Sequence, residues 1–168
     1  MSDPLAQISL KNPWHLLATG FGSGLSPLVP GTMGTLAAVP FFLLLAQLPI
    51  SVYLVIVVVG FALGVKLCAV TSHDMGVHDH GAIVWDEFIG FWLTMTVMPL
   101  CHIPLSEWQW IVTGFVLFRL FDMIKPWPIS WLDRHVHGGF GIMVDDMIAG
   151  VMAGLALYLV GFYAGWLN

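Results

Sequence analysis

Residues 50–70 read ISVYLVIVVVGFALGVKLCAV, an apolar run in which Lys66 is the only charged residue. A helix needs about 20 predominantly apolar residues to cross the hydrocarbon layer of a bilayer. The run therefore predicts a membrane-spanning helix. The composition of the whole chain also suits a lipid bilayer, because 58% of its 168 residues are hydrophobic and only 9% are charged. A soluble domain usually carries about a quarter charged residues.

Four further apolar stretches surround this one, at residues 33–48, 88–101, 108–124 and 147–167. The stretch at 33–48 contains Pro40 and that at 88–101 is short, so either could be a partial or re-entrant span sheltered by its neighbours. Pro49 predicts a tight turn between the first two stretches. We therefore expect one all-α integral membrane domain over residues 1–168, a single bundle of about five apolar helices, one or two of them short or re-entrant.

Composition excludes several classes of protein. Lys and Arg total only five and the formal net charge is -5, which argues against a nucleic-acid binder. The two cysteines, Cys68 and Cys101, have no spacing typical of a disulfide scaffold or a zinc site. We expect both to be small core residues.

Charge placement predicts an orientation for the bundle. If all five stretches cross and the N-terminus is cytoplasmic, every Lys and Arg faces the cytoplasm, as the positive-inside rule requires. Nine of the ten acidic residues fall on that side as well, and only Glu107 falls on the other. Acidic residues contribute little to orientation. Their concentration needs another cause, and a reacting site is the obvious candidate.

Two pairs of adjacent acids stand directly before apolar stretches. Asp86-Glu87 precedes the third stretch and Asp145-Asp146 precedes the last. The simpler explanation is that a helix N-terminus favours acids, but this explanation weakens when the pattern recurs. On a helix Asp146 shares a face with the small residue Gly150, so at least one carboxylate should point into a packing seam. Carboxylates at such depth are costly, which favours a functional interpretation.

A basic segment lies between the two acidic pairs. Arg119, Asp122 and Lys125 follow one another at i, i+3 and i+6, and Lys125-Pro126 predicts the end of a helix near the interface. An internal ion pair with a snorkelling lysine would explain Arg119 with Asp122. It leaves Lys125 and Arg134 unexplained.

Together these patterns predict a magnesium site on a phosphate-binding surface. Five carboxylates at close range would repel one another unless a hard cation neutralised them. Mg²⁺ takes oxygen ligands, keeps several waters and is completed by substrate phosphate oxygens. The nearby basic side chains supply the donors that a phosphate needs. The carboxylates are Asp86, Glu87, Asp122, Asp145 and Asp146, and the bases are Arg119, Lys125 and Arg134.

Two other stretches carry weaker signals. Residues 20–35 are rich in glycine, serine and threonine, and a helix beginning near Thr32 could attract an anion. A loop with an ordinary Ser/Thr helix cap is the favoured interpretation of this stretch alone. Histidines 73, 78 and 80 lack regular metal-ligand spacing and are expected to be solvated loop residues.

The chain resembles the bacterial phosphatidylglycerophosphatase A family. The resemblance runs through four blocks that span most of the sequence: 24–27 (GLSP) with 30–32 (PGT), 83–87 (IVWDE), 118–128 (FRLFDMIKPWP) and 138–146 (GGFGIMVDD) with 149–150 (AG). One departure is His80, where many relatives have proline, which bears only on the shape of that loop.

The resemblance implies a Mg²⁺-dependent lipid phosphatase that removes the terminal phosphate of phosphatidylglycerophosphate and leaves phosphatidylglycerol. It implies a multi-pass protein of the bacterial inner membrane, and the charge pattern adds an active site that faces the cytoplasm. Its expected partners are that substrate and membrane lipid, with no nucleic acid and no obligate protein partner.

For the carboxylates we predict catalytic and metal-binding roles. Asp86, Asp122 and Asp146 are expected to form the metal core. Glu87 and Asp145 are expected to act as further ligands, as support to the ligands or as general base.

For the other site residues we predict contacts to the substrate. Lys125 and Arg134 would hold the leaving phosphate, and Arg119 would orient its neighbouring carboxylate. Ser26 and Thr32, in the glycine-rich stretch, complete the predicted substrate-binding set.

The motifs leave alternatives of mechanism and of function. No cysteine is followed by an arginine as in cysteine phosphatases, and no Asp-x-Asp nucleophile motif occurs. Metal-assisted attack by water is therefore the simplest mechanism, with a covalent aspartyl phosphate as the alternative. The rival function is a small cation or proton transporter that uses the acidic cluster. A carrier should hold its charges near the bilayer midplane, whereas here they gather at one interface. A passive scaffold subunit, the third interpretation, has no need of paired acids with clustered bases.

Overall fold

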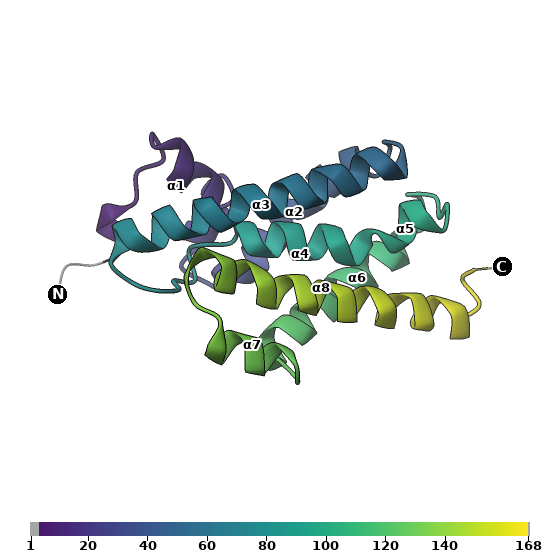
Figure 1. Ribbon diagram of the computed structural model, residues 1–168. Coiled ribbons are helices and arrows are strands. Elements are labelled where there is room, and N and C mark those ends of the chain that lie inside the picture. The colour runs from purple at the N-terminus through teal and green to yellow at the C-terminus, as the bar shows by residue number, and fades with distance from the viewer. Residues whose placement is uncertain (1–3, 168) are drawn as a thin grey trace.

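The computed structural model describes residues 4–167, and within that range it contains helices and loops but no strand (Figure 1). The helices, in chain order, are η1 (Pro4–Gln7), α1 (Pro13–Ala18), η2 (Ser23–Leu25), α2 (Pro30–Leu45), α3 (Ile50–Met75), α4 (Trp85–Met95), α5 (Val97–Leu100), α6 (Trp108–Ile124), α7 (Ile129–His135) and α8 (Gly138–Tyr163). The predicted all-α class is confirmed.

Two helices, α3 and α8, are long and apolar enough to cross a membrane. Each has 26 residues, which corresponds to about 39 Å at 1.5 Å per residue. Helices α2 and α6 have 16 and 17 residues, and the stretch at 88–101 forms α4 and the four-residue α5, which meet at Thr96. All five apolar stretches are thus largely helical, and that any of these helices crosses a membrane stays a prediction.

Helices α4 and α8 run parallel and touch through their main chains. A Cβ atom added at Gly150 would lie 2.5 Å from the carbonyl oxygen of Gly90. One turn further along α4, the hydroxyl of Thr94 donates to the carbonyl of Gly150 at 3.2 Å. Since a side chain at either glycine would separate the helices, Gly150 serves the packing seam that its spacing predicts.

Helix α3 runs antiparallel to α4. A Cβ at Gly60 would lie 2.6 Å from the Ile89 side chain, and one at Gly64 would lie 2.7 Å from the ring of Trp85. Later residues of α3 therefore contact earlier residues of α4. The end of α3 lies beside the start of α4.

Helix α6 is also antiparallel to α4. Gly114 packs against Met95, near the end of α4, and Phe118 reaches Gly90, near its middle. The end of α6, which carries the predicted basic segment, consequently lies beside the start of α4.

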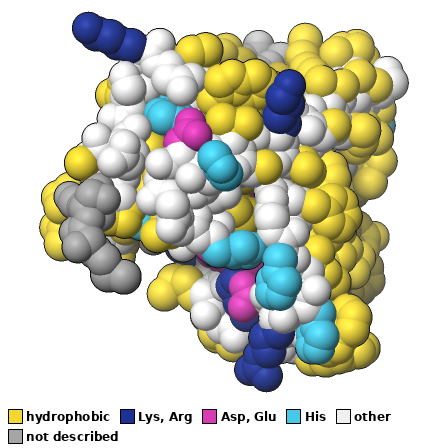
Figure 2. Space-filling model, turned by 60° about the vertical axis from the view of Figure 1, so that its left-hand side comes forward, with side chains coloured by type: hydrophobic (Ala, Val, Ile, Leu, Met, Phe, Trp, Pro, Cys, Tyr) yellow, Lys and Arg dark blue, Asp and Glu magenta, His cyan; other side chains and the backbone are white. Residues whose placement is uncertain are grey.

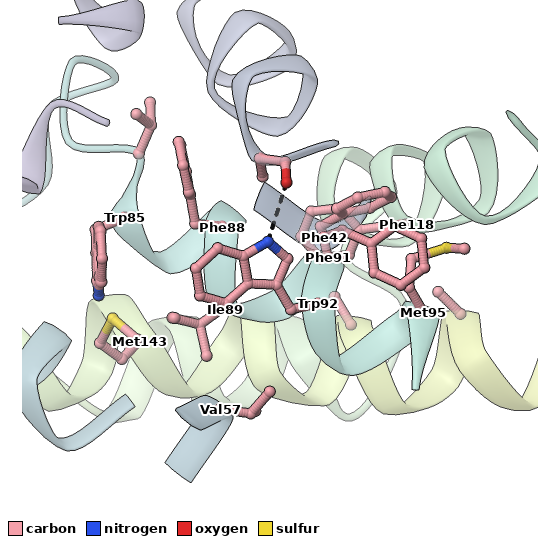
Figure 3. Packing of buried hydrophobic residues seen from close by; sticks show 14 of the residues in the cluster. Phe42, Val57, Trp85, Phe88, Ile89, Phe91, Trp92, Met95, Phe118 and Met143 are labelled. Carbon is pink, nitrogen blue, oxygen red and sulfur yellow. Dashed lines mark hydrogen bonds between the residues drawn. The ribbon is translucent and has the colours of Figure 1, made fainter. Parts of the chain in front are cut away.

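Helix α2 instead runs parallel to α4. Gly34 packs against Val84, just before α4. One turn further along α2, the Ala38 carbonyl accepts a hydrogen bond of 3.0 Å from the indole Nε1 of Trp92 (Figure 3).

Aromatic side chains fill the centre of the bundle, where Trp92 lies among Phe88, Phe91 and Phe42 (Figure 3). The hydroxyl of Tyr53 donates to the carbonyl of Trp92 at 2.5 Å. Because lipid tails are as apolar as these side chains, close packing and satisfied polar groups, rather than exclusion of water, hold such helices together in a membrane.

These directions bring the starts of α2, α4 and α8, the ends of α3 and α6, and all of α7 to one end of the bundle, which we call the polar end. Figure 2 shows charged and histidine side chains on this end and hydrophobic side chains along the flank. Glu107 precedes α6 at the opposite end, Asp3 lies outside the described residues, and the other acids belong to the polar end. The predicted clustering is confirmed; that this end faces the cytoplasm stays a prediction.

Two expected helix starts are corrected. Helix α8 begins at Gly138, so Asp145 and Asp146 lie in its second and third turns and no helix N-terminus explains them. Helix α2 begins at Pro30 with Val29 as its N-cap and without a side-chain hydrogen bond, so the expected Ser/Thr cap is wrong.

Candidate functional site

The main-chain seam between α4 and α8 brings two buried acids to the same level. Asp86 precedes Gly90 by one turn, and Asp146 precedes Gly150 by one turn, on helices that run parallel. Asp86 is 9% exposed and Asp146 is 3% exposed. The sequence pattern did place one carboxylate in the seam, and the structure adds its counterpart from α4.

A first ion-pair group, the Arg119 group, joins three helices. The guanidinium Nη1 of Arg119 lies 3.0 Å from Glu87 Oε1 and 2.7 Å from Asp122 Oδ2. From α2, the hydroxyl of Thr35 donates to Glu87 Oε2 at 3.1 Å. Gly31, one turn earlier on α2, leaves room for this group, because a side chain there would collide with Glu87. The i, i+3 pair predicted from the sequence therefore exists, with Glu87 added to it.

A second ion-pair group, the Lys125 group, joins α6, α7 and α8. The ammonium Nζ of Lys125 lies 2.5 Å from both Asp133 Oδ1 and Asp145 Oδ2. Lys125 caps α6 in the left-handed conformation, with φ of 44°, and this turn aims its side chain back toward α8. Burial disfavours the charge, but the hydrogen bonds to the two carboxylates dominate and raise the pKa of Lys125 above its ordinary value. Lys125 is therefore protonated at neutral pH.

Asp86 and Asp146 have no cationic partner within the described residues 4–167. Asp86 Oδ1 accepts a hydrogen bond from the backbone N–H of Glu87 at 3.0 Å. Asp146 Oδ2 is buried and has no hydrogen-bond partner in the part of the chain that the structure describes. A buried carboxylate oxygen without a donor is unusual, because such groups carry a desolvation penalty. These two acids are where a bound cation would relieve the largest cost.

The five predicted metal ligands thus divide into two sets. Across residues 4–167, no group of three or more His, Cys, Asp or Glu side chains stands close enough to hold a metal ion. Glu87 and Asp122 are paired with Arg119, and Asp145 is paired with Lys125. Asp86 and Asp146 remain. This donor set fits Mg²⁺, which is usually held by one or two carboxylates, waters and substrate phosphates rather than by an all-protein cage.

Three other predicted residues lie outside these contacts. Arg134 is exposed on α7 and makes no ion pair with a described residue. The hydroxyl of Ser26 donates to the carbonyl of Leu28 at 2.9 Å. Thr32 lies in the first turn of α2, next to Gly31. The predicted substrate contacts of all three stay predictions.

Sequence reasoning missed Thr35 and Asp133 as partners in the site. Thr35 follows Gly31 by one turn, so the glycine-rich stretch held a helix-spacing signal. Asp133 had no comparable signal. Its pairing with Lys125 depends on how the chain turns between α6 and α7.

A cavity of about 530 Å³ opens beside the Lys125 group. Its lining residues are His78, Asp79, Asp133, Val136, His137, Gly141, Ile142 and Asp145. The backbone N–H of Gly138 donates to His78 Nε2 at 2.8 Å, which ties the loop before α4 to the start of α8. Asp145 and Asp133 belong both to the cavity and to the Lys125 group, so a ligand in the cavity would lie against the two carboxylates that hold the ammonium group.

Comparison with known proteins agrees with the four sequence blocks. The family model for phosphatidylglycerophosphatase A matches residues 16–161. The chain is 56% identical over 158 residues to the phosphatidylglycerophosphatase A of Escherichia coli K12, covering 94% of this chain and 89% of the relative. It is 46% identical to that of Haemophilus influenzae, covering 96% and 97%. No solved structure matches the chain. The chain belongs to the phosphatidylglycerophosphatase A family.

Proposed function

We propose that this chain hydrolyses phosphatidylglycerophosphate to phosphatidylglycerol and inorganic phosphate, as the names of its relatives indicate for those proteins. The observation that carries the proposal is the composition of the polar end. Two buried carboxylates without a cationic partner, Asp86 and Asp146, lie among the Arg119 and Lys125 groups. A phosphomonoester needs such a combination of a cation site and directed donors.

Mg²⁺ is the proposed cofactor, held by Asp86 and Asp146. When bound, it supplies charge to neutralise the two acids, polarises phosphoryl oxygens and lowers the pKa of a water molecule. Glu87 and Asp122 then keep Arg119 in place and are support to the site rather than ligands. This assignment narrows the five predicted metal ligands to two.

The phosphate contacts come from the two basic side chains. Arg119 Nε has no hydrogen-bond partner among the described residues, but it is buried, so a phosphoryl oxygen would reach this N–H only if the surrounding side chains moved to admit it. Lys125 is charged and is held by Asp133 and Asp145, which line the cavity. If phosphoryl oxygens replace part of the contacts between Lys125 and its carboxylates, the ammonium group still has anionic partners.

The reaction is a single displacement at phosphorus. A water oxygen forms a bond to phosphorus while the bond from phosphorus to the glycerol oxygen breaks, and that oxygen leaves with the electron pair and takes up a proton. Asp145 lines the cavity together with Asp79 and Asp133. We assign to Asp145 the role of general base, which accepts the proton of the attacking water and passes it to the leaving glycerol oxygen. The products are the free hydroxyl of phosphatidylglycerol and inorganic phosphate.

We also propose that the protein is multi-pass in the bacterial inner membrane, with its polar end toward the cytoplasm. The two spans α3 and α8 support membrane insertion. All five Lys and Arg residues occur at the polar end or in segments that pack there, as expected for a cytoplasmic face.

The deciding experiment measures phosphate release by the purified chain in detergent micelles. Phosphatidylglycerophosphate, phosphatidic acid and lysophosphatidic acid are compared, each with and without a chelator. We expect release to be fastest with the first lipid and to stop with the chelator. A rate of phosphate release that is unchanged by the chelator would overturn the magnesium proposal. Absence of release would favour a transporter or a scaffold.

The matched variants are Asp86→Asn, Asp146→Asn and Glu107→Gln. Either aspartate variant should lose roughly 100-fold or more of the rate, because a metal ligand contributes several kcal/mol to the transition state. Glu107 lies at the opposite end of the bundle, so its variant should keep the full rate. Near-normal activity of both aspartate variants would refute the assignment.

A further inference from the structure

An apolar stripe runs along α6 and is not covered by the rest of the bundle. Val112, Val116, Leu120 and Met123 are all exposed. Their spacing of four, four and three residues puts them on one face of the helix. This stripe therefore extends along α6 up to its polar end.

Two tryptophans continue the stripe where α6 gives way to α7. Trp127 is 79% exposed and Trp131 is 52% exposed. With Pro128 and Leu132 they line a shallow hollow of about 400 Å³. Large aromatic side chains exposed in a group mark a contact surface rather than scattered surface residues.

A third exposed tryptophan, Trp108, stands at the other end of α6. The 17 residues of α6 correspond to about 25 Å, close to the thickness of the hydrocarbon layer of about 30 Å. Tryptophan is enriched at both membrane–water interfaces, where its ring is apolar and its N–H is polar. Trp108 and Trp127 thus bracket the stripe as interfacial residues would.

A second marker of the same boundary lies on the other flank of the polar end, where α1 packs against α3 (Figure 1). The ammonium of Lys66 sits 4.8 Å from the centre of the Trp14 ring. Val65, next to this lysine, contacts Gly139 in the first turn of α8. Basic and aromatic side chains therefore occur together at this level on both flanks.

We propose that residues 126–135, the α7 segment, are an interfacial element that docks on the surface of the lipid bilayer, with Trp127 and Trp131 at the boundary between headgroups and acyl chains. Continuity with the apolar stripe of α6 identifies lipid as the occupant. On α7, Ser130, Asp133 and Arg134 follow one another at i, i+3 and i+4 and share one face, as expected for a short helix that lies in the interface.

The docking has a consequence for the site. Asp133 on α7 holds Lys125, and Lys125 holds Asp145 on α8. Seating the α7 segment in the interface therefore sets the Lys125 group at headgroup depth. A lipid phosphate that diffuses in the plane of the bilayer arrives at that depth. The docking rests on the proposed membrane insertion, and this consequence rests in addition on the proposed phosphatase activity.

Depth measurements test the docking directly. Trp127→Cys and Trp131→Cys, made in a Cys68→Ala/Cys101→Ala background, carry a nitroxide label in vesicles of phosphatidylcholine and phosphatidylglycerol. We expect both labels to be more accessible to oxygen than to a water-soluble nickel chelate. The control is His73→Cys, whose native side chain is 89% exposed near the end of α3; its label should show the reverse preference. Labels at 127 and 131 that prefer the chelate, or that broaden each other across a dimer, would overturn the proposal.

Kinetics in vesicles provide a second measurement that keeps the native cysteines. The double variant Trp127→Ser/Trp131→Ser should raise KM for long-chain substrate in vesicles by about threefold or more and keep kcat. It should leave the rate on a monomeric short-chain substrate unchanged, and Trp127→Phe/Trp131→Phe should restore KM. Trp108→Ser is the control at the far end, with an unchanged KM. An equal loss on both substrates would contradict the proposal, and if no variant releases phosphate, the proposed function fails while the depth result stands.

Discussion

The Arg119 group and the Lys125 group have the same composition, one cation between two carboxylates, but they differ in burial. The side chains of Arg119, Glu87 and Asp122 are 14%, 11% and 13% exposed. In the other group, Lys125 is 28% and Asp133 41% exposed, and only Asp145 is buried, at 7%. The first group is enclosed by α2, α4 and α6, whereas the second borders an open cavity and reaches the exposed α7.

This difference separates a fixed support from an exchangeable contact. Removing one member of a buried ion pair leaves an uncompensated charge, which costs far more than the pair itself contributes. A half-exposed pair is weak, because water and ions replace its partner. We expect the Arg119 group to control folding and the Lys125 group to control substrate handling.

The largest expected effect is the loss of stability in Arg119→Ala. Glu87 and Asp122 would remain buried without their cation, at a cost of about 3–5 kcal/mol. Thermal unfolding in detergent, followed by light scattering, should show a large fall in Tm. Arg119→Lys serves as the control and should recover only part of it, because an ammonium cannot copy the guanidinium geometry. An unchanged Tm in Arg119→Ala would mean that the two groups do not differ in this way.

Magnesium should stabilise the wild-type protein through Asp86 and Asp146, the two acids that belong to neither ion-pair group. A ligand present at 100 times its Kd adds about 2.7 kcal/mol to the free energy of unfolding. We expect saturating Mg²⁺ to raise the Tm of the wild type and to leave that of Asp86→Asn or Asp146→Asn unchanged. Without Mg²⁺, the variants should be at least as stable as the wild type, since each removes a buried charge that has no cation. A Mg²⁺-dependent rise in Tm that survives in both variants would place the metal elsewhere.

Lys125→Ala should separate activity from stability. Its ion pair with Asp133 is partly exposed and contributes about 1 kcal/mol or less. Asp145, however, is 7% exposed and would lose its cation, so the free energy of unfolding should fall by more than the exposed pair contributes, but by less than in Arg119→Ala, where two buried carboxylates lose theirs. Phosphate release should fall roughly 10-fold or more, since a charge that faces the phosphate is lost. Lys125→Arg should lose less activity than Lys125→Ala. If Lys125→Ala instead unfolds the protein while keeping its specific activity, the proposed division of roles is reversed.

The smallest expected effect belongs to Thr35→Val, which removes one hydrogen bond to Glu87 and keeps the shape of the side chain. The cost should be about 1 kcal/mol. It would appear as a modest fall in Tm. Thr32→Val, in the same helix, is the control and should show no comparable change, because Thr32 makes no hydrogen bond to the Arg119 group.

Local sequence patterns predicted the end of α6 but not the start of α8. Lys125-Pro126 stops the helix for a reason contained in the dipeptide, since proline restricts the residue before it. The glycines at 138–141 look like a loop, yet they belong to α8. Gly139 is small because the main chain of α3 passes against it, and Gly141 because that of Val136 does. A sequence does not distinguish a glycine needed for a turn from one needed for close packing.

The sequence predicted which helix ends carry the acids and bases of the candidate site, but not which of these side chains form ion pairs. Charge partition along the chain gathered the acids and bases at one end. Which carboxylates are neutralised by Arg119 and Lys125 depends on helix register and on the path of the chain through α7. Asp133 was therefore missed, and Asp86 with Asp146 could not be singled out among five candidates.

The contact of Gly90 with Gly150 has a consequence for ion selectivity. Backbone atoms, which cannot change rotamer, set how close α4 and α8 approach. They therefore also set the distance between the main chains at Asp86 and Asp146, which precede the two glycines by one turn. Rearranging neighbouring side chains would leave this gap unchanged. For the proposed cation site, a wider gap suited to a larger cation such as Ca²⁺ would require a bulkier residue at one of the two glycines, so we expect discrimination between divalent ions to depend on positions that touch no ligand.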